Sequence, residues 1–302
     1  MAKIPEDLAW DLAWARAATG DRGFYSHSLP YDHFTTSVQH STLATDLLPY
    51  VRTALLRGPI RFIDVGAGTG LLAEQISDLL TPAERERTTL ICLDVRPRPA
   101  HLSAAIDWIE GDVRETIIQI PAGHTVLVAH EFLDDLPCAM AEVGSDGVAH
   151  IMVADHTHFT PTLGAALDTA SPEYEWLKKW WPTTRPFMRC EIGITRDACW
   201  RDLTALVSSG FAIAIDYAHM RADRIRGVWD GGTLTGYRAG QTLTPQATGE
   251  MNITAHVALD ALADASSGTP HITMLQDGPT PDFWWLIAAY AIEFPQPAKM
   301  TP

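Results

Sequence analysis

From residue 61 to about residue 129, short apolar runs alternate with segments that have the apolar spacing of helices. Strands that alternate with helices are typical of a parallel sheet with crossover helices. The alternation stops after Pro137, and an apolar run returns at 211–215, where we expect the sheet to resume. The runs predicted as strands lie within 61–65, 89–93, 106–110, 125–129, 211–215 and 272–275, and an aromatic segment at 283–294 completes the core.

Segments with other patterns surround this sheet. Before it, two helix candidates form an N-terminal cap. After Pro137, a hairpin and a tryptophan-rich helix are interpreted as an insertion. Further on, a Gly- and Thr-rich stretch is predicted as an ordered loop, followed by a loop that enters a helix with Thr254 as its N-cap. These segments are 9–18 and 42–57 for the cap, 140–154 and 173–181 for the insertion, 220–250 for the Gly- and Thr-rich loop, and 252–263 for the last loop and helix.

The turn after the first predicted strand carries few side chains. Its sequence, FIDVGAGTG, places Gly66, Gly68 and Gly70 shortly after Asp64 at the strand end. Backbone can approach a ligand closely only where side chains are absent, so this turn predicts a nucleotide-type ligand. A pyrophosphate is disfavoured because Leu71 replaces the third glycine of the dinucleotide pattern, and a triphosphate because no Gly-Lys-Ser/Thr follows. The remaining cofactor is S-adenosylmethionine (SAM), whose amino group Asp64 would bind directly or through water.

Two further acids follow the next two predicted strands. Asp94 ends the second strand, where an acid accepts hydrogen bonds from both ribose hydroxyls of a nucleoside. Asp112 follows a glycine after the third strand, and its side chain and the backbone of Val113 suit recognition of the adenine edge. Either aspartate could instead cap a helix or complete a turn, which is the commoner role of aspartate. The order of acid, glycine turn, acid and acid favours a SAM site.

Composition narrows the choice of partners and compartment. The 302 residues carry a formal net charge of -15, from 37 Asp and Glu against 22 Lys and Arg. This balance disfavours nucleic acid as a partner, because phosphate neutralisation needs clustered cations. The sequence has neither an apolar run of membrane-spanning length nor a signal-peptide pattern, so we expect a cytoplasmic protein without a membrane partner. The four cysteines are scattered, and neither a disulfide framework nor a metal site is indicated.

Several motifs together are similar to one family. They are HFTTS (33–37), FIDVGAGTG (62–70), HEFLDDLP (130–137), AIDYAH (214–219), GTLTGY (232–237) and NITAHV (252–257). They resemble the MidA-type methyltransferases, bacterial relatives of the mitochondrial complex I assembly factor that methylates a protein arginine. The segments WWP (180–182) and CEIG (190–193) resemble an actinobacterial branch of that family. The chain departs from the family pattern at His130 and Asn252, where Asn and Asp are usual.

The resemblance implies an α/β fold of the class I SAM-dependent methyltransferase type, Rossmann-like, with a seven-stranded, mostly parallel sheet. It adds Thr36, Ser37 and Ala67 to the expected cofactor contacts. The implied partner is a protein or peptide that carries arginine, and the oligomeric state stays open. The expected organisation is an N-terminal helical cap (1–57), a SAM-binding core (58–137), an inserted hairpin and helical subdomain (138–190), and the remainder of the core (191–302) with a substrate loop at 220–250.

Carboxylates after the fourth and fifth predicted strands are the candidates for chemistry. Glu131, Asp134 and Asp135 follow the fourth strand, at the end where open α/β sheets bind substrate, and Asp216 ends the fifth. If the acceptor is an arginine, two acids near the methyl group would orient its guanidinium, which is always protonated and presents a planar fork. We name Glu131 first, then Asp134 and Asp216, as catalytic candidates. Each could merely cap the following helix, and Asp135 could face solvent.

One histidine and a group of tryptophans carry weaker signals. His256, in the TAHV motif, could accept a proton, contact the substrate or be structural, and we include it among the catalytic candidates. The tryptophans at 176, 180 and 181 are predicted to pack in a core rather than to form a wall for a cation.

Three other functions remain open from the residues alone. A methyltransferase for a small metabolite would share the cofactor motifs. A non-catalytic assembly factor could keep the fold without the chemistry. A nicotinamide dehydrogenase is disfavoured by Leu71.

Overall fold

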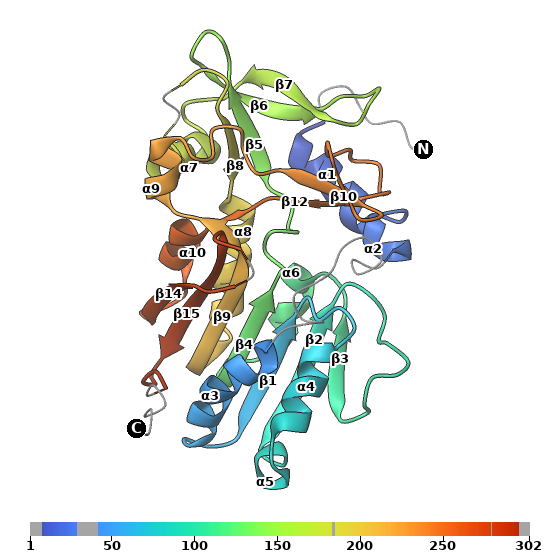
Figure 1. Cartoon of the computed structure of the whole chain (residues 1–302), viewed down its shortest axis with the longest axis vertical. Coiled ribbons are helices and arrows are strands. Elements are labelled where there is room, and N and C mark those ends of the chain that lie inside the picture. Colours follow the sequence, from blue (N-terminus) through green and yellow to red (C-terminus); the bar gives the residue numbers. More distant parts are fainter. Residues whose placement is uncertain (1–7, 29–41, 183–184, 279, 296–302) are drawn as a thin grey trace. The chain divides into compact units, whose positions relative to one another are not determined.

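The computed structural model describes residues 8–28, 42–182, 185–278 and 280–295 (Figure 1). The chain divides into two compact units. Unit 1 comprises the residues up to 36, residues 131–198 and residues 216–265, and unit 2 comprises residues 37–130, residues 199–215 and the residues from 266 onward. In the part of the chain that is described, no helix has both the length and the apolar character needed to cross a membrane.

The predicted parallel sheet forms in unit 2. Its strand order is β14-β15-β9-β4-β1-β2-β3. Neighbouring strands from β9 to β3 pair parallel, whereas β14 and β15 pair antiparallel (Figure 1). The expected α/β fold with a mostly parallel central sheet is therefore confirmed. The strands are β1 (Ile60–Val65), β2 (Thr88–Asp94), β3 (Ile106–Glu110), β4 (Gly123–His130), β9 (Val207–His219, whose last residues belong to unit 1), β14 (His271–Gln276) and β15 (Phe283–Tyr290).

Helices cover this sheet through apolar stripes. α3 (Leu43–Leu55) contacts β1 and β4, and α4 (Leu71–Leu79) contacts β1 and β2. The stripe of α3 includes Leu47 and Val51, and that of α4 includes Leu72 and Ile76, at the spacing that brings side chains to one helix face. Five of the six residues of β1 are buried, as in a central strand that is covered on both faces. Shorter helices complete the unit: α5 (Pro82–Arg85), α6 (Val113–Thr116) and a 3-10 turn at Ile117–Gln119.

Unit 1 contains two small antiparallel sheets. The first has the order β7-β6-β5-β8, and the hairpin predicted from the sequence is formed by β5 and β6. The second has the order β11-β10-β12. In addition, the short strand β13 (Val257–Ala258) pairs parallel with the end of β9. The strands are β5 (Ala139–Val143), β6 (Ala149–Ala154), β7 (Pro161–Ala166), β8 (Arg189–Ile192), β10 (Thr235–Arg238), β11 (Gln241–Leu243) and β12 (Asn252–Thr254).

Two apolar clusters form the core of unit 1. Trp10 and Trp14 belong to the first cluster. Trp176 and Trp181 lie in the second, with Trp180 packed against it, so the packing role predicted for these tryptophans is confirmed. The helices are α1 (Trp10–Thr19), α2 (Phe24–His27), α7 (Pro172–Trp180), α8 (Ile194–Thr204, whose last residues belong to unit 2), α9 (Arg221–Arg226) and α10 (Leu259–Ala265).

The segment from 252 to 258 differs from its prediction. Thr254 was expected to cap a helix, but it is the last residue of β12 and pairs with Thr235 of β10. The helix, α10, begins only at Leu259. This pairing joins residues far apart in the sequence, so local composition does not reveal it. His256 therefore lies between two short strands, and the stretch 220–250 contains α9, β10 and β11 between its loops.

Candidate functional site

The glycine turn after β1 has a backbone conformation that suits glycine. The φ angles are 69° at Gly66, 62° at Gly68 and 79° at Gly70, which lie in the left-handed region. The turn is tied to β2, because the amides of Gly66 and Ala67 donate to the Leu93 carbonyl at 2.9 and 3.1 Å. A Cβ atom at Gly70 would lie 2.5 Å from a methyl group of Leu102. Backbone geometry and close packing thus both explain the glycines.

Asp94, the last residue of β2, holds this turn. Its Oδ2 accepts a hydrogen bond of 2.7 Å from the Gly68 amide, and its Oδ1 accepts one of 2.9 Å from the Arg96 amide. Arg96 Nε also forms an ion pair of 3.2 Å with Oδ1. A carboxylate oxygen can accept more than one hydrogen bond, so these contacts are compatible with ribose hydroxyls as further donors. Sequence reasoning missed Arg96, because its contact with Asp94 is visible only in the structure and no motif marks it.

Asp64, near the end of β1, is a buried acid of unit 2. Its side chain is 3% exposed, and its Oδ2 has no hydrogen-bond partner among the residues that the structure describes. Burial, together with the neighbouring Asp94 charge, raises the pKa of Asp64 to about 7. A cationic group would offset both effects. The turn and this acid therefore fit SAM, with Asp64 as the residue that would hold its amino group.

The remaining predicted cofactor residues have mixed outcomes. Asp112 caps α6, with its side chain accepting a hydrogen bond from the Arg114 amide at 2.9 Å, which is the alternative role considered for it. Val113 is the first residue of α6 and is buried. Their contact with an adenine stays a prediction. Thr36 and Ser37 lie outside the described residues.

We predict that Asp64→Asn stabilises the cofactor-free protein above neutral pH. Because the carboxyl pKa is higher in the folded state than in the unfolded state, binding of the proton favours the folded state. This contribution is fully present below about pH 4 and is lost as the pH rises to 7. The free energy of unfolding of the variant should therefore exceed that of the wild type increasingly from pH 4 to 7, by at most about 4 kcal/mol. Urea unfolding at several pH values measures the difference. Asp78→Asn, at an exposed position of α4, is the control, and identical pH dependence of wild type and D64N would contradict the prediction.

In unit 1, the predicted catalytic acids lie together. Glu131 has a φ of 46°, a conformation that is uncommon for a residue with a side chain and is often retained at functional sites. Asp216 Oδ2 accepts hydrogen bonds from the amides of Leu133 and Asp134 at 2.9 and 3.2 Å. Asp216 therefore positions the segment that follows Glu131. Of these acids, Asp134 is 5% exposed and Asp216 1% exposed.

Burial and mutual repulsion raise the pKa values of Asp134 and Asp216. Burial, with the Glu131 charge, raises the pKa of Asp216 to about 7. Burial and the charges of Asp216, Asp135 and Glu131 raise the pKa of Asp134 well above its ordinary value. The Oδ1 atom of Asp134 has no hydrogen-bond partner within the described ranges. We call Glu131, Asp134, Asp135 and Asp216 the acidic cluster. It has the properties of a site for a cation.

Asp135 does not extend into solvent. Tyr25 of α2 donates a hydrogen bond to its Oδ2, and Asn252 Nδ2 donates one of 2.9 Å to its Oδ1. Tyr25 also lies 3.0 Å from Asn252 Oδ1. Burial raises the pKa of Asp135 to about 6, although both hydrogen bonds oppose the rise. Asn252, one of the two departures from the family pattern, thus contacts the acidic cluster directly.

His130, the other departure, is the last residue of β4 and belongs to unit 2. Its ring forms an edge contact with Phe283, with 6.1 Å between the ring centroids. Among the residues that the structure describes, no group of three or more His, Cys, Asp or Glu side chains is arranged to hold a metal ion.

His256 lies in an aromatic group of unit 1. Its ring stacks on Tyr217 at 5.8 Å between centroids and meets the ring of Trp229 edge-on at 5.1 Å. Its main-chain amide donates a hydrogen bond of 2.8 Å to Thr233 Oγ1. Tyr217 adjoins Asp216 in sequence, and the Tyr217 amide donates to Asp216 Oδ1 at 3.0 Å. The histidine is therefore linked to the acidic cluster through Tyr217.

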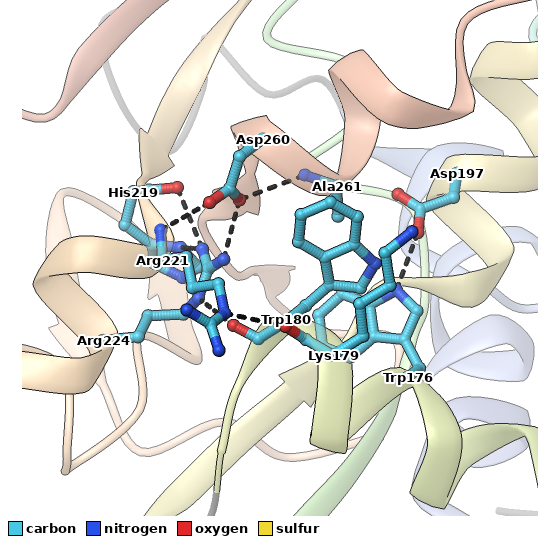
Figure 2. A network of polar contacts seen from close by, with 9 residues as sticks. All are labelled: Trp176, Lys179, Trp180, Asp197, His219, Arg221, Arg224, Asp260 and Ala261. Carbon is cyan, nitrogen blue, oxygen red and sulfur yellow. Dashed lines mark hydrogen bonds and ion pairs between the residues drawn. The ribbon is translucent and has the colours of Figure 1, made fainter.

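A buried network fixes the neighbouring His219. Figure 2 shows Arg224 between His219 and Asp260, and Arg224 Nη1 donates to His219 Nδ1 at 2.8 Å while Nη2 pairs with Asp260 at 2.7 Å. Because arginine keeps its protons, Nδ1 of His219 is an acceptor and the ring proton lies on Nε2. Burial, with the Arg224 charge, lowers the pKa of His219 well below its ordinary value, so this ring is neutral.

Two residues of this region were missed as site residues. Glu191 of the CEIG motif is 2% exposed and accepts hydrogen bonds from the amides of Thr233 and Leu234 at 2.7 and 3.2 Å. The match of CEIG to a family motif was the signal that could have identified it. Arg196 of α8 is 2% exposed and donates to main-chain carbonyls of the acidic cluster. Nothing in its local sequence distinguishes it from a surface arginine.

Comparisons with known proteins identify the family and the fold of the chain. Residues 41–275 match the family model described as "Putative S-adenosyl-L-methionine-dependent methyltransferase". A search of curated proteins gave no significant match. One similar structure, from Burkholderia thailandensis, is described as a "likely methyl transferase" bound to S-adenosyl-homocysteine; it is 18% identical, with a TM-score of 0.75 over 95% of this chain and 89% of that one.

A second structure from Burkholderia thailandensis, described as uncharacterised, is also 18% identical, with a TM-score of 0.74 over 95% of this chain and 88% of that one. These two likenesses concern the fold. The family model covers most of the chain, including the glycine turn and the acidic cluster. The chain therefore belongs to this family of SAM-dependent methyltransferases.

Proposed function

We propose that the enzyme methylates a guanidinium nitrogen of an arginine in a protein or peptide. The observation that carries the proposal is the acidic cluster of unit 1. Asp134 and Asp216 are nearly completely buried, and no ion pair joins either carboxylate to a cation within the described residues. Buried like charges are unfavourable unless a cation accompanies them. An arginine side chain would supply that cation with a geometry that carboxylates bind well.

The chemistry of the transfer assigns roles to the acids. Bound SAM supplies an electrophilic methyl group. A bond forms between the guanidinium nitrogen and the methyl carbon as the carbon–sulfur bond breaks, the bonding electron pair stays on sulfur, and the nitrogen releases its proton. The protein mainly has to position the nitrogen and stabilise charge. Glu131 and Asp134 are proposed to hold the guanidinium and to accept the released proton, directly or through water.

Asp216 and His256 have supporting roles in this proposal. Asp216 uses its Oδ2 to bind the amides of Leu133 and Asp134, so it would act by positioning Asp134. His256, stacked on Tyr217, is proposed to contact the substrate. Tyr217 and Trp229 are half-buried residues, and aromatic faces attract a guanidinium.

We also propose the finer MidA-type assignment and its actinobacterial branch. Three of the motifs that carry the resemblance, CEIG, GTLTGY and NITAHV, contact one another in unit 1, which supports a common role for them. Glu191 of CEIG binds Thr233 of GTLTGY, and Thr233 in turn binds His256 of NITAHV. Cytoplasmic location is part of the same proposal, because the four free cysteines are buried thiols that a reducing compartment would preserve.

The test is transfer of isotope-labelled methyl groups. The purified protein is incubated with methyl-labelled SAM and a pool of peptides that contain arginine, beside the same pool with lysine in its place. We expect label on arginine peptides only, located on the guanidinium by tandem mass spectrometry. In a parallel reaction with cell lysate, the label on proteins and the label on low-mass material are counted separately. Label confined to low-mass material would favour a small-molecule substrate, and bound SAM without transfer to either fraction would favour a non-catalytic role.

A further inference from the structure

Arg196, in the first turn of α8, is buried in unit 1. The residue is only 2% exposed, and its guanidinium carbon lies 5.7 Å from the centroid of the Trp14 ring. A buried arginine is costly unless its donors and its charge are satisfied. The contacts that satisfy it should therefore indicate what the residue does.

The hydrogen bonds of Arg196 join two segments of the candidate acceptor site. Its Nε donates to the Leu136 carbonyl at 3.0 Å, and its Nη2 donates to the Asp134 carbonyl at 2.8 Å. Its Nη1 donates to the carbonyls of Ala255 and His256 at 2.8 and 3.0 Å. A planar fork can hold carbonyls on two sides at fixed angles, whereas an ammonium group cannot. The acidic cluster and the His256 segment are thus bound to one rigid group.

The positive charge of Arg196 affects nearby carboxylates without forming an ion pair with them. In the described part of the chain its hydrogen bonds go to main-chain carbonyls, and no ion pair joins it to a carboxylate. Burial raises the pKa of each neighbouring carboxyl, and the Arg196 charge opposes that rise. The acids affected are Asp134, Asp135, Glu191, Asp197 and Asp216.

Other charged groups face the same region. Glu131 raises the pKa of Asp134, Asp135 and Asp216. His219, on β9, is kept neutral mainly by burial, so it adds no charge of its own. The positive charge of Arg196 therefore offsets part of the rise in the pKa of all five affected carboxyls.

We infer that Arg196 is the positioning residue of the acceptor site: its fork aligns the acidic cluster with the His256 segment, and its positive charge lies near the cluster without pairing with a carboxylate of the described residues. The inference rests on the proposed arginine methylation for the nature of the acceptor. A salt bridge from Arg196 to Asp134 would block that carboxylate. Donation to main-chain carbonyls leaves Asp134 Oδ1, which has no hydrogen-bond partner among the described residues, available to a cationic substrate.

Two substitutions separate the two parts of this role. Arg196→Lys keeps the charge but loses the fork, and Arg196→Met loses both. Arg201→Met is the matched control, because Arg201 lies on the same helix, and its side chain is 57% exposed and pairs with the neighbouring Asp202 at 3.8 Å. Circular dichroism and binding of S-adenosylhomocysteine, both unchanged from the wild type, would show that a variant remains folded.

The first readout requires no substrate. Carboxyl carbons of 13C-labelled protein are titrated by NMR in the wild type, R196K, R196M and R201M. We expect R196M to move the titration of the acidic cluster to higher pH by about one unit, because an opposite charge nearby lowers a carboxyl pKa by roughly that amount. R196K and R201M should titrate like the wild type. Unchanged titration in R196M would overturn the inference.

The second readout is methyl transfer to the arginine peptide pool as a function of pH. We expect kcat to fall about 100-fold in R196M, because a displacement of reacting groups by about 1 Å has an effect of that size. The acid limb of the pH–rate profile of R196M should also move to higher pH. R196K should lose activity without a shift of the limb. Active enzyme with wild-type kcat and profile in both variants would refute the positioning role. A wild type that labels no arginine peptide would instead refute the proposed function, and the carboxyl titration would still decide on Arg196.

Discussion

Gly68→Val is expected to abolish SAM binding while leaving the fold intact. Gly68 has a φ of 62°, and its amide donates to Asp94 Oδ2 at 2.7 Å. A β-branched residue in the left-handed region costs roughly 1–2 kcal/mol. The larger effect comes from the side chain itself, since close approach of a ligand to this turn requires its absence. Isothermal titration with SAM should show affinity lowered on the order of 100-fold or more.

Gly147→Val separates the two effects of that substitution. Gly147 has a φ of 78° in the β5–β6 turn, and a Cβ atom there would meet no atom within 4 Å. The control therefore has similar backbone strain at a position without a predicted ligand contact. Both variants should lose similar amounts of thermal stability, and only G68V should lose SAM binding. Wild-type affinity in G68V would show that the cofactor does not lie against this turn.

Glu131→Gln is expected to abolish most methyl transfer without affecting SAM binding. The substitution preserves size and removes one negative charge from the acidic cluster, in which Asp134 and Asp216 are buried. A negative charge that is positioned beside the reacting guanidinium contributes strongly to catalysis. The kcat with the arginine peptide pool should therefore fall roughly 100- to 1000-fold. Labelled methyl transfer measures kcat, and titration with SAM measures cofactor binding.

The control for this variant is Glu175→Gln. Glu175 lies on α7 with its side chain 60% exposed, where a lost charge has little effect. E175Q should retain wild-type kcat. Because Gln and Glu have similar backbone preferences, the φ of 46° at position 131 should be tolerated equally in E131Q. Full activity of E131Q would remove Glu131 from the mechanism and leave Asp134 as the first candidate.

The cofactor turn was predictable because its signals are local. A buried strand that ends near an acid, followed by glycines in the left-handed region, is encoded within about ten residues, and β1, Asp64 and Gly66–Gly70 appear as expected. Asp112 shows the limit of such signals. An aspartate before a helix can cap it or bind a ligand, and the capping role is the one visible in the structure.

Long-range pairing explains what sequence reasoning missed in unit 1. Residues 252–254 have a helix-entry pattern, but they pair with β10 instead. The contact of Asp135 with Tyr25 joins residues 110 positions apart, and Arg196 reaches carbonyls about 60 positions away on either side. Neither contact has a signature in the neighbouring residues. Tyr25, Arg196 and the stacking of Tyr217 on His256 could be recognised only after folding.

The amino-acid sequence by itself determined the class of fold and the class of cofactor, since strand periodicity, glycine spacing and strand-end acids are properties of short segments. It also identified the acids of HEFLDDLP and AIDYAH as candidates. Only the tertiary structure decided that Asp216 binds the backbone of the Asp134 segment, that Asn252 and Tyr25 hold Asp135, and that Arg196 binds main-chain carbonyls instead of carboxylates. The physical reason is that burial and charge act between neighbours in space, and these neighbours come from distant parts of the chain.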